Sequence, residues 1–339
     1  MSFINVKNNF ILKQIFNHLE IQTYLNIVRY NKSLQNKLNK DINDYKKIYF
    51  SIIIDIIPEQ NIAEYNFINL IDKKKIHIYL DDNPEETEKN SLKKDDKIKK
   101  IKIIIDNDIN TLNGLFKKCN SIKKMKIKSL QNNIQDMSNI FYGDFCITEI
   151  DFSKFYTNNV NSLDSMFCEC IKLEKLNLSN FITDNVENMS NLFRGCESLK
   201  EINISNFNTN KVINMSSMFN RCISLEKIDL SNFNTENVTK MDSMFKRCAS
   251  LKQLNLSNFN TRKVYNMVSM FEECSSLEEL NLSNFSTKNA DLSFMFRNCS
   301  SLKKLEFKIY KNHYPYRIFD YCVSLDDSYK KVYSSCILF

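Results

Sequence analysis

Glycine and proline are scarce in this sequence, which has three of each among 339 residues and no tryptophan. This scarcity excludes a collagen helix, Pro-rich linkers and the Gly-rich loops that hold phosphates. Histidine is equally rare, since His18, His77 and His313 are the only three. No GxSxG or HExxH motif is present, no local Cys–His pair occurs, and the carboxylates are spread along the chain. We therefore expect a protein that is not an enzyme, with no catalytic residue, cofactor or metal site.

Long apolar runs are also missing. The longest, such as SIIIDII at residues 51–57, have strand length, and none reaches the roughly 18 residues of a membrane-spanning helix. The first residues, MSFINVKNNFILKQIF, lack the apolar core and cleavage site of a secretory signal. The net charge is +7, but the 47 basic and 40 acidic residues are interleaved. These features predict a cytoplasmic protein with no membrane span and no nucleic-acid partner.

The sequence is instead rich in internal repeats. The Phe of an S-x-F motif recurs every 26 residues, and a second Phe recurs at intervals of 23 to 26 residues. A regular middle with irregular ends is typical of a solenoid, because its terminal repeats cap the core. The first series is Phe155, Phe181, Phe207, Phe233, Phe259 and Phe285, and the second is Phe116, Phe141, Phe167, Phe193, Phe219, Phe245, Phe271, Phe296 and Phe319.

Each unit changes its hydrophobic period in the middle. Residues 251–256 (LKQLNL) alternate near their end and predict a short strand. Residues 264–274 (VYNMVSMFEEC) place apolar groups on one stripe and predict a helix of about two and a half turns. Between them, residues 257–261 (SNFNT) supply Asn and Thr side chains that bond to the backbone, so the turn needs no glycine. Stacked in parallel, the strands would form a continuous sheet with about 4.8 Å per unit.

The repeated phrase SNFNTxxVxxMxxMFxxCxSLxxLxLS resembles the 26-residue repeat of the BspA-like leucine-rich repeat family, over about residues 101–307. That family occurs in bacterial surface proteins, mycoplasma lipoproteins and proteins of single-celled eukaryotes. The resemblance implies an α/β leucine-rich-repeat solenoid, with parallel strands on its concave face and short helices on its convex face. It also implies a scaffold that binds a protein partner on the concave face or, as the alternative, a cell-surface adhesin.

A cysteine stands three residues after the second Phe in eight units. Neighbouring helices pack about 8–10 Å apart, which is too far for a disulfide between equivalent positions. Zinc is not expected, because the histidines lie outside the regular repeats. We predict that these cysteines are small buried side chains and that the methionines, which recur in the same phase, fill the core. The row is Cys119, Cys170, Cys196, Cys222, Cys248, Cys274, Cys299 and Cys322; Asp144 interrupts it, while Cys146, Cys168 and Cys336 fall outside it and are candidates for exposure.

Outward-facing strand positions form the expected contact surface. One row varies in sign and its neighbour is nearly constant, a pattern that either a partner-binding face or simple solubility produces. The candidate partner-binding residues are Lys175, Asn177, Glu201, Asn203, Lys227, Asp229, Gln253, Asn255, Glu279 and Asn281.

Residues 1–50 differ from the repeats and contain apolar residues at helical spacing. They resemble an F-box, the helical module that docks Skp-type adaptors of ubiquitin ligases. That resemblance implies a substrate receptor with the adaptor-docking residues Ile15, Phe16, Leu19, Leu25 and Val28. A helical cap over the first repeat is the alternative. Residues 51–100 are expected to hold irregular first strands and a charged loop, residues 101–307 the repeats, and residues 308–339 a C-terminal cap.

Overall fold

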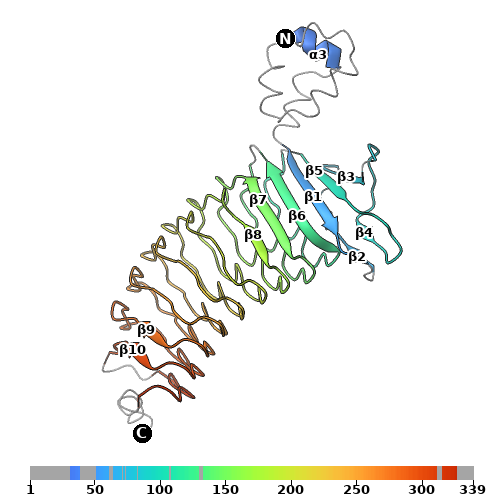
Figure 1. Ribbon diagram of the computed structural model, residues 1–339. Coiled ribbons are helices and arrows are strands. Elements are labelled where there is room, and N and C mark those ends of the chain that lie inside the picture. Colours follow the sequence, from blue (N-terminus) through green and yellow to red (C-terminus); the bar gives the residue numbers. More distant parts are fainter. Residues whose placement is uncertain are drawn as a thin grey trace, which may run out of the picture.

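The computed structural model describes residues 31–38, 51–60, 64–70, 72, 74–81, 83–106, 108–129, 133–310 and 315–326. These residues contain the helix α3 (Lys32–Leu38) and the strands β1 to β10 (Figure 1). No helix in this part of the chain is long and apolar enough to cross a membrane. The predicted adaptor-docking residues, and with them most of the predicted N-terminal module, lie outside the described residues.

The first repeats share one sheet with the strands that precede them. Antiparallel strands form one half of this sheet and parallel strands the other, and the change of direction falls between β1 and β6 (Figure 1). The Ile-rich run predicted as a strand forms β1, with Ile52, Ile54 and Ile56 buried. The strand β6, where the parallel part of the sheet begins, pairs with β1 on one side and with β7 on the other. The order is β3 (Ile76–Leu80), β5 (Ile101–Ile105), β1 (Ile52–Pro58), β6 (Ile122–Ser129), β7 (Glu149–Phe155) and β8 (Lys175–Asn177); β2 (Tyr65–Asn66) pairs separately with β4 (Ser91–Leu92).

The second half of each repeat consists of turns, so the predicted short helices are wrong. Residues 264–274 and their equivalents in the other described repeats contain turns and isolated parallel bridges. Backbone N–H groups donate to the next repeat, as from Ser217 to the Asp242 carbonyl at 2.8 Å and from Phe219 to the Met244 carbonyl at 2.9 Å. A helix is about 10–12 Å across with its side chains, whereas hydrogen-bonded neighbours lie about 4.8 Å apart. Helices therefore cannot fill this position while each repeat bonds directly to the next.

We call each repeat a coil, the half around residues 214–222 the turn side, and the half around residues 201–203 the strand side. The strand side is only partly paired. β8 pairs with β7, and β9 (Glu279–Asn281) pairs with β10 (Lys304–Glu306), but residues 201–203, 227–229 and 253–255 form no strand. The predicted continuous sheet is therefore wrong for these three coils.

The two rows of phenylalanine rings have different spacings. On the turn side, Phe219 stacks on Phe193 and on Phe245 with ring centroids 5.6 Å apart in both cases. Beside the strands, the Phe181 and Phe207 rings are 6.5 Å apart. Consecutive coils therefore lie closer together on the turn side, which agrees with the open strand ladder.

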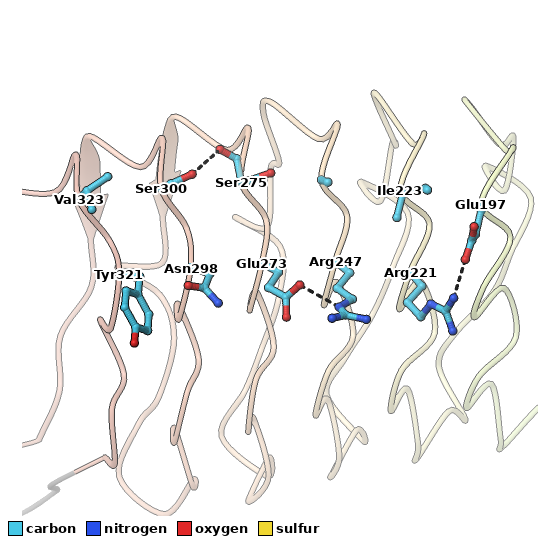
Figure 2. Close-up of a pocket in the computed structure, with 11 residues that line it drawn as sticks. Glu197, Arg221, Ile223, Arg247, Glu273, Ser275, Asn298, Ser300, Tyr321 and Val323 are labelled. Atoms are coloured by element: carbon cyan, nitrogen blue, oxygen red, sulfur yellow. Dashed lines mark hydrogen bonds and ion pairs between the residues drawn. The ribbon is translucent and has the colours of Figure 1, made fainter.

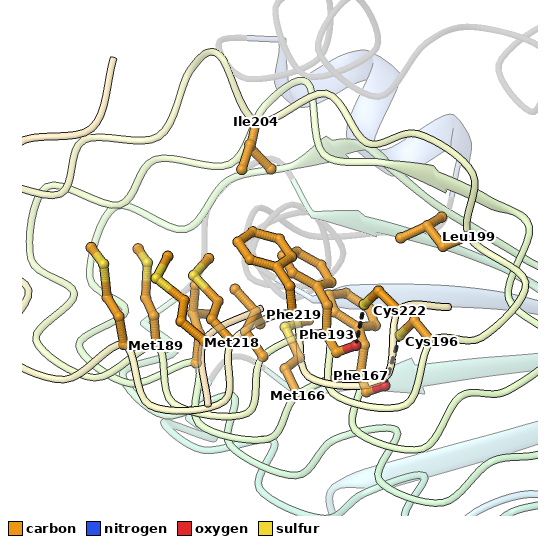
Figure 3. Close-up of a cluster of buried hydrophobic side chains, with 14 of the residues drawn as sticks. Met166, Phe167, Met189, Phe193, Cys196, Leu199, Ile204, Met218, Phe219 and Cys222 are labelled. Carbon is orange, nitrogen blue, oxygen red and sulfur yellow. Dashed lines mark hydrogen bonds between the residues drawn. The ribbon is translucent and has the colours of Figure 1, made fainter. Parts of the chain in front are cut away.

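The core is a continuous column of Phe, Met, Leu and Cys side chains that runs through the stack (Figure 3). Met189, Phe193, Cys196 and Met218 are fully buried. The prediction that the recurring methionines and the cysteine row fill the core is confirmed for the described residues.

Truncation of the core phenylalanine should separate the inside from the outside of a coil. Phe219→Ala removes a ring that is 1% exposed, and we expect the free energy of unfolding to fall by about 3–5 kcal/mol. Lys227→Ala, on the exposed strand side, should change it by no more than about 0.5 kcal/mol. Urea unfolding of the two variants checks this, and equal losses would contradict the assignment.

Candidate partner-binding surface

All ten predicted partner-binding residues lie at the surface of the strand side. They form the two expected rows, with one residue of each row in every coil. The structure assigns each row an internal role as well.

The row that varies in sign forms ion pairs between neighbouring coils. Lys227 Nζ lies 2.9 Å from Glu201 Oε2, and Lys304 Nζ lies 2.7 Å from Glu279 Oε1. The hydrogen bond from Lys227 lowers the pKa of Glu201 and raises that of Lys227 itself. Like charges directly opposite one another would repel, so alternating signs favour this register of the coils. In chain order the row is Lys124, Glu149, Lys175, Glu201, Lys227, Gln253, Glu279 and Lys304.

The nearly constant row closes a turn at the end of each strand segment. Asn203 Oδ1 accepts a hydrogen bond from the Ser205 N–H at 3.1 Å, and Asp229 Oδ1 accepts one from the Ser231 N–H at 2.9 Å. Asn and Asp side chains bond to the backbone two residues ahead in this way more strongly than Ser or Thr side chains do. The constancy of the row therefore has a structural cause.

A hollow of about 440 Å³ opens where the strand ladder is unpaired. No backbone hydrogen bond joins residues 201–203 to residues 227–229. The half-buried side chains of Ile202 and Ile228 line the hollow beside charged groups. Four predicted partner-binding residues surround it, namely Glu201, Asn203, Lys227 and Asp229. The sequence identified these residues, but the hollow depends on the separation of the coils.

A second groove, of about 650 Å³, was not predicted from the sequence (Figure 2). Its walls come from the residues on either side of the cysteine row. Arg221 Nη2 lies 2.7 Å from Glu197 Oε1, and Arg247 Nε lies 2.8 Å from Glu273 Oε2. The only sequence feature that could have indicated this groove is the variation, from one unit to the next, of the residues immediately before and after each cysteine. The lining residues are Glu197, Arg221, Ile223, Arg247, Ala249, Glu273, Ser275, Asn298, Ser300, Tyr321 and Val323.

Gly195 makes room for a charged contact beside this groove. Its φ is 73°, and a Cβ there would lie 2.9 Å from the Glu169 carboxyl carbon. The Glu169 side chain occupies that space and reaches within 3.7 Å of Arg221. Any larger residue would have to displace Glu169.

The cysteines of the row donate hydrogen bonds, a role that the sequence did not reveal (Figure 3). Cys222 Sγ donates to the Phe193 carbonyl at 3.1 Å, and Cys196 Sγ donates to the Phe167 carbonyl at 3.2 Å. Burial raises the pKa of the Cys274 thiol to about 12, so it stays protonated and keeps its proton available for donation. None of the ten described cysteines forms a disulfide.

The three cysteines outside the row differ from one another. The expected exposure of Cys168 is wrong: it is 1% exposed, because it lies in a turn packed between neighbouring coils, and burial raises its pKa to about 12. Cys146 is half-buried, and Cys336 lies outside the described residues. In the part of the chain described, no group of three or more His, Cys, Asp or Glu side chains is placed to hold a metal ion.

The repeats match a family described as "Mycoplasma protein of unknown function, DUF285", over residues 110–227 and 193–309. The chain belongs to this family. Both the hollow and most of the groove fall within the matched residues, whereas the F-box-like segment precedes them.

Two solved structures are similar to this chain. One is a leucine-rich repeat protein of T. pallidum, TpLRR, with 18% identity and a TM-score of 0.42 over 64% of this chain and 89% of that one. The other is a leucine-rich repeat protein from Bacteroides ovatus, with 18% identity and a TM-score of 0.33 over 65% of this chain and 70% of that one. No curated protein matches.

Alkylation should distinguish the cysteines by burial. In a Cys336→Ser background, we expect iodoacetamide at pH 8 to modify Cys146 while the buried row and Cys168 remain unlabelled, because only an accessible thiolate reacts. Mass spectrometry of the folded and urea-unfolded protein counts the labels. Rapid labelling of Cys168 in the folded protein would contradict its burial.

Proposed function

We propose that this chain is a non-catalytic cytoplasmic scaffold that binds a protein partner through the strand side of a leucine-rich-repeat solenoid. The observation that carries the proposal is the hollow between residues 201–205 and 227–229. Its combination of apolar and charged groups is that of a contact surface, and it lies at the centre of the predicted partner-binding rows.

The chemistry of the hollow suits a protein partner. Ile202 and Ile228 offer apolar surface, while Glu201 and Lys227 stand beside them as charged groups. Protein interfaces combine an apolar centre with a polar rim in this way. The Glu201 and Lys227 side chains are 68% and 78% exposed, so their ion pair contributes little to stability and a partner can replace it at small cost.

The groove shown in Figure 2 is the second candidate for the partner-binding face. Arg and Tyr are enriched where interfaces bind most strongly, and Lys and Glu are depleted there. The groove has Arg221, Arg247 and Tyr321, and the Tyr321 side chain is 60% exposed. Its composition favours a partner, whereas its ion pairs already occupy both arginines.

Charge exchange within an ion pair tests the strand side without removing the pair. Affinity purification of the full chain from its own cells first identifies a partner. The double variant Glu201→Lys with Lys227→Glu then reverses the charges that this partner meets. We expect its Kd to rise at least about tenfold, which corresponds to about 1.4 kcal/mol, and the free energy of unfolding to change by less than about 1 kcal/mol.

Two further exchanges serve as controls. Glu279→Lys with Lys304→Glu makes the same change in the same row, away from the hollow, and should leave the Kd within about threefold of the original value. Arg247→Glu with Glu273→Arg makes the equivalent charge exchange in the groove. If only the groove variant loses binding, the partner binds in the groove and the strand-side proposal is refuted.

The F-box-like segment supports a sharper hypothesis, in which the scaffold is the substrate receptor of a ubiquitin ligase. A Skp-type adaptor should then bind the full chain in a pull-down, and Ile15→Asp with Leu19→Asp should abolish binding, because both place a charge where the resemblance requires an apolar contact. The Phe219→Ala variant controls for damage to the repeats. Failure of the unaltered chain to bind the adaptor would reject the receptor role and leave the scaffold proposal intact.

A further inference from the structure

One position of the cysteine row is occupied by an aspartate, Asp144. In seven coils the row's thiol donates to the Phe carbonyl of the preceding coil, with Sγ–O distances of 2.9–3.2 Å. Asp144 takes this place in the coil of Phe141, between Cys119 and Cys170. Its exposure is 0%, so it lies as deep as the thiols do.

The two carboxyl oxygens of Asp144 have different surroundings. Oδ1 accepts hydrogen bonds from the N–H groups of Cys146 at 3.2 Å and Ile147 at 3.3 Å. Oδ2 is buried and has no hydrogen-bond partner as an acceptor. A buried polar atom of this kind is costly unless it forms a hydrogen bond.

The repeat indicates which atom Oδ2 faces. In those seven coils the side chain of this row contacts the Phe carbonyl of the preceding coil, and for Asp144 the equivalent carbonyl belongs to Phe116. The coils of Phe116 and Phe141 stack as the others do, with ring centroids 5.7 Å apart and ring planes 8° apart. The Phe116 carbonyl also accepts the Cys119 N–H at 3.0 Å, just as its counterparts accept the N–H groups of their own cysteines. Two acceptor oxygens can attract each other only if one of them carries a proton.

We propose that Asp144 is a neutral carboxylic acid whose Oδ2–H donates to the Phe116 carbonyl, so that a proton links the first two coils of the stack. The titratable groups that face it are the thiols of Cys119, Cys146 and Cys170, and none of these is a cation. Burial raises the pKa of Asp144 well above its ordinary value, against the opposing effect of the Cys146 and Ile147 N–H groups.

This hydrogen bond makes the contact between the coils of Phe116 and Phe141 sensitive to pH. The carboxyl of an unfolded chain has a pKa of about 3.9. Because the folded-state pKa is raised, the folded protein binds more protons than the unfolded chain between the two values. Stability is therefore fully present below about pH 3.9 and is lost as the pH rises through the folded pKa, with up to about a tenfold change in the unfolding equilibrium per pH unit. Deprotonation leaves two oxygens facing each other without a proton, so opening should begin between the coils of Phe116 and Phe141.

The protonation state can be observed directly. The full chain is labelled with ¹³C at the Asp carboxyl carbon, and Asp144→Asn assigns the resonance by its loss. We expect the Asp144 signal to be that of a carboxylic acid at pH 6. Asp151 is the matched control: burial opposes its ionisation, but hydrogen bonds from Lys126 and Ser153 outweigh burial and lower its pKa. Its signal should therefore be that of a carboxylate at the same pH. An Asp144 signal that titrates near pH 4 would overturn the proposal.

Stability supplies the second measurement. Urea unfolding is followed from pH 4.5 to 7.5 for the unaltered chain, Asp144→Asn and Asp144→Cys. An amide donates to the Phe116 carbonyl without titrating, and a thiol restores the row. The unfolding constant of the unaltered chain, relative to either variant, should rise with pH. Parallel pH profiles would reject the proton link, and Asp144→Cys keeps the comparison valid if the Asn variant does not fold.

Discussion

The backbone hydrogen bonds between coils on the turn side are the constraint on which the rest of the structure depends. They fix each coil directly against the next, as the pair Phe219 N–H and Met244 carbonyl shows. At that separation identical side chains stack on identical side chains, so a row of rings, thiols or hydroxyls extends through the molecule. Hydrogen bonds also join neighbouring coils at the corner between the two sides, around Thr183. Thr183 Oγ1 donates to the Asn208 carbonyl at 2.9 Å and accepts the Asn208 N–H at 2.8 Å. One buried Thr therefore bonds both backbone groups of Asn208, the residue that precedes its own counterpart Thr209 in the next coil.

Close contact on one side leaves the other side free to open. The rings beside the strands stack at wider separations than those on the turn side, and the strand ladder is unpaired at residues 201–203 and 227–229. The stack is held on its turn side and at its corners, so the strand side need not be bonded in every coil. The proposed partner-binding hollow is a direct consequence of this division.

The sequence predicted the inside and the outside of the coil correctly except at Cys168, and the backbone of its second half incorrectly. Burial follows from side-chain type at a fixed period, so the Phe, Met and Cys rows were accessible to sequence reasoning. Apolar residues at intervals of three and four fit stacked turns as well as a helix. The distinguishing feature is a positive φ at residues such as Ser217, at 56°, and Arg221, at 62°, where no glycine marks it. Left-handed conformations at such residues cost of order 1 kcal/mol or more each, and hydrogen bonds to the neighbouring coil offset this cost only in the assembled stack. The groove beside Arg221 was not predicted because it is built on these turns, whereas the exposed strand rows follow from simple alternation and were predicted.

In a stack of near-identical coils, the informative residues are those that depart from their row. Gln253 is the one uncharged member of a row that otherwise alternates Lys and Glu. It follows Lys227, so that lysine has a charged partner in the row only on the Glu201 side, whereas Glu279 pairs on its far side with Lys304. The Glu201–Lys227 ion pair therefore spans the hollow, whereas the row cannot continue as an ion pair from Lys227 to Gln253, where the backbone ladder is also open. Between the coils of Lys227 and Gln253, neither the strand ladder nor an ion pair of this row joins the two coils. Lys227 thus lies between the hollow and this gap in the row, and this position favours it as a contact for a partner.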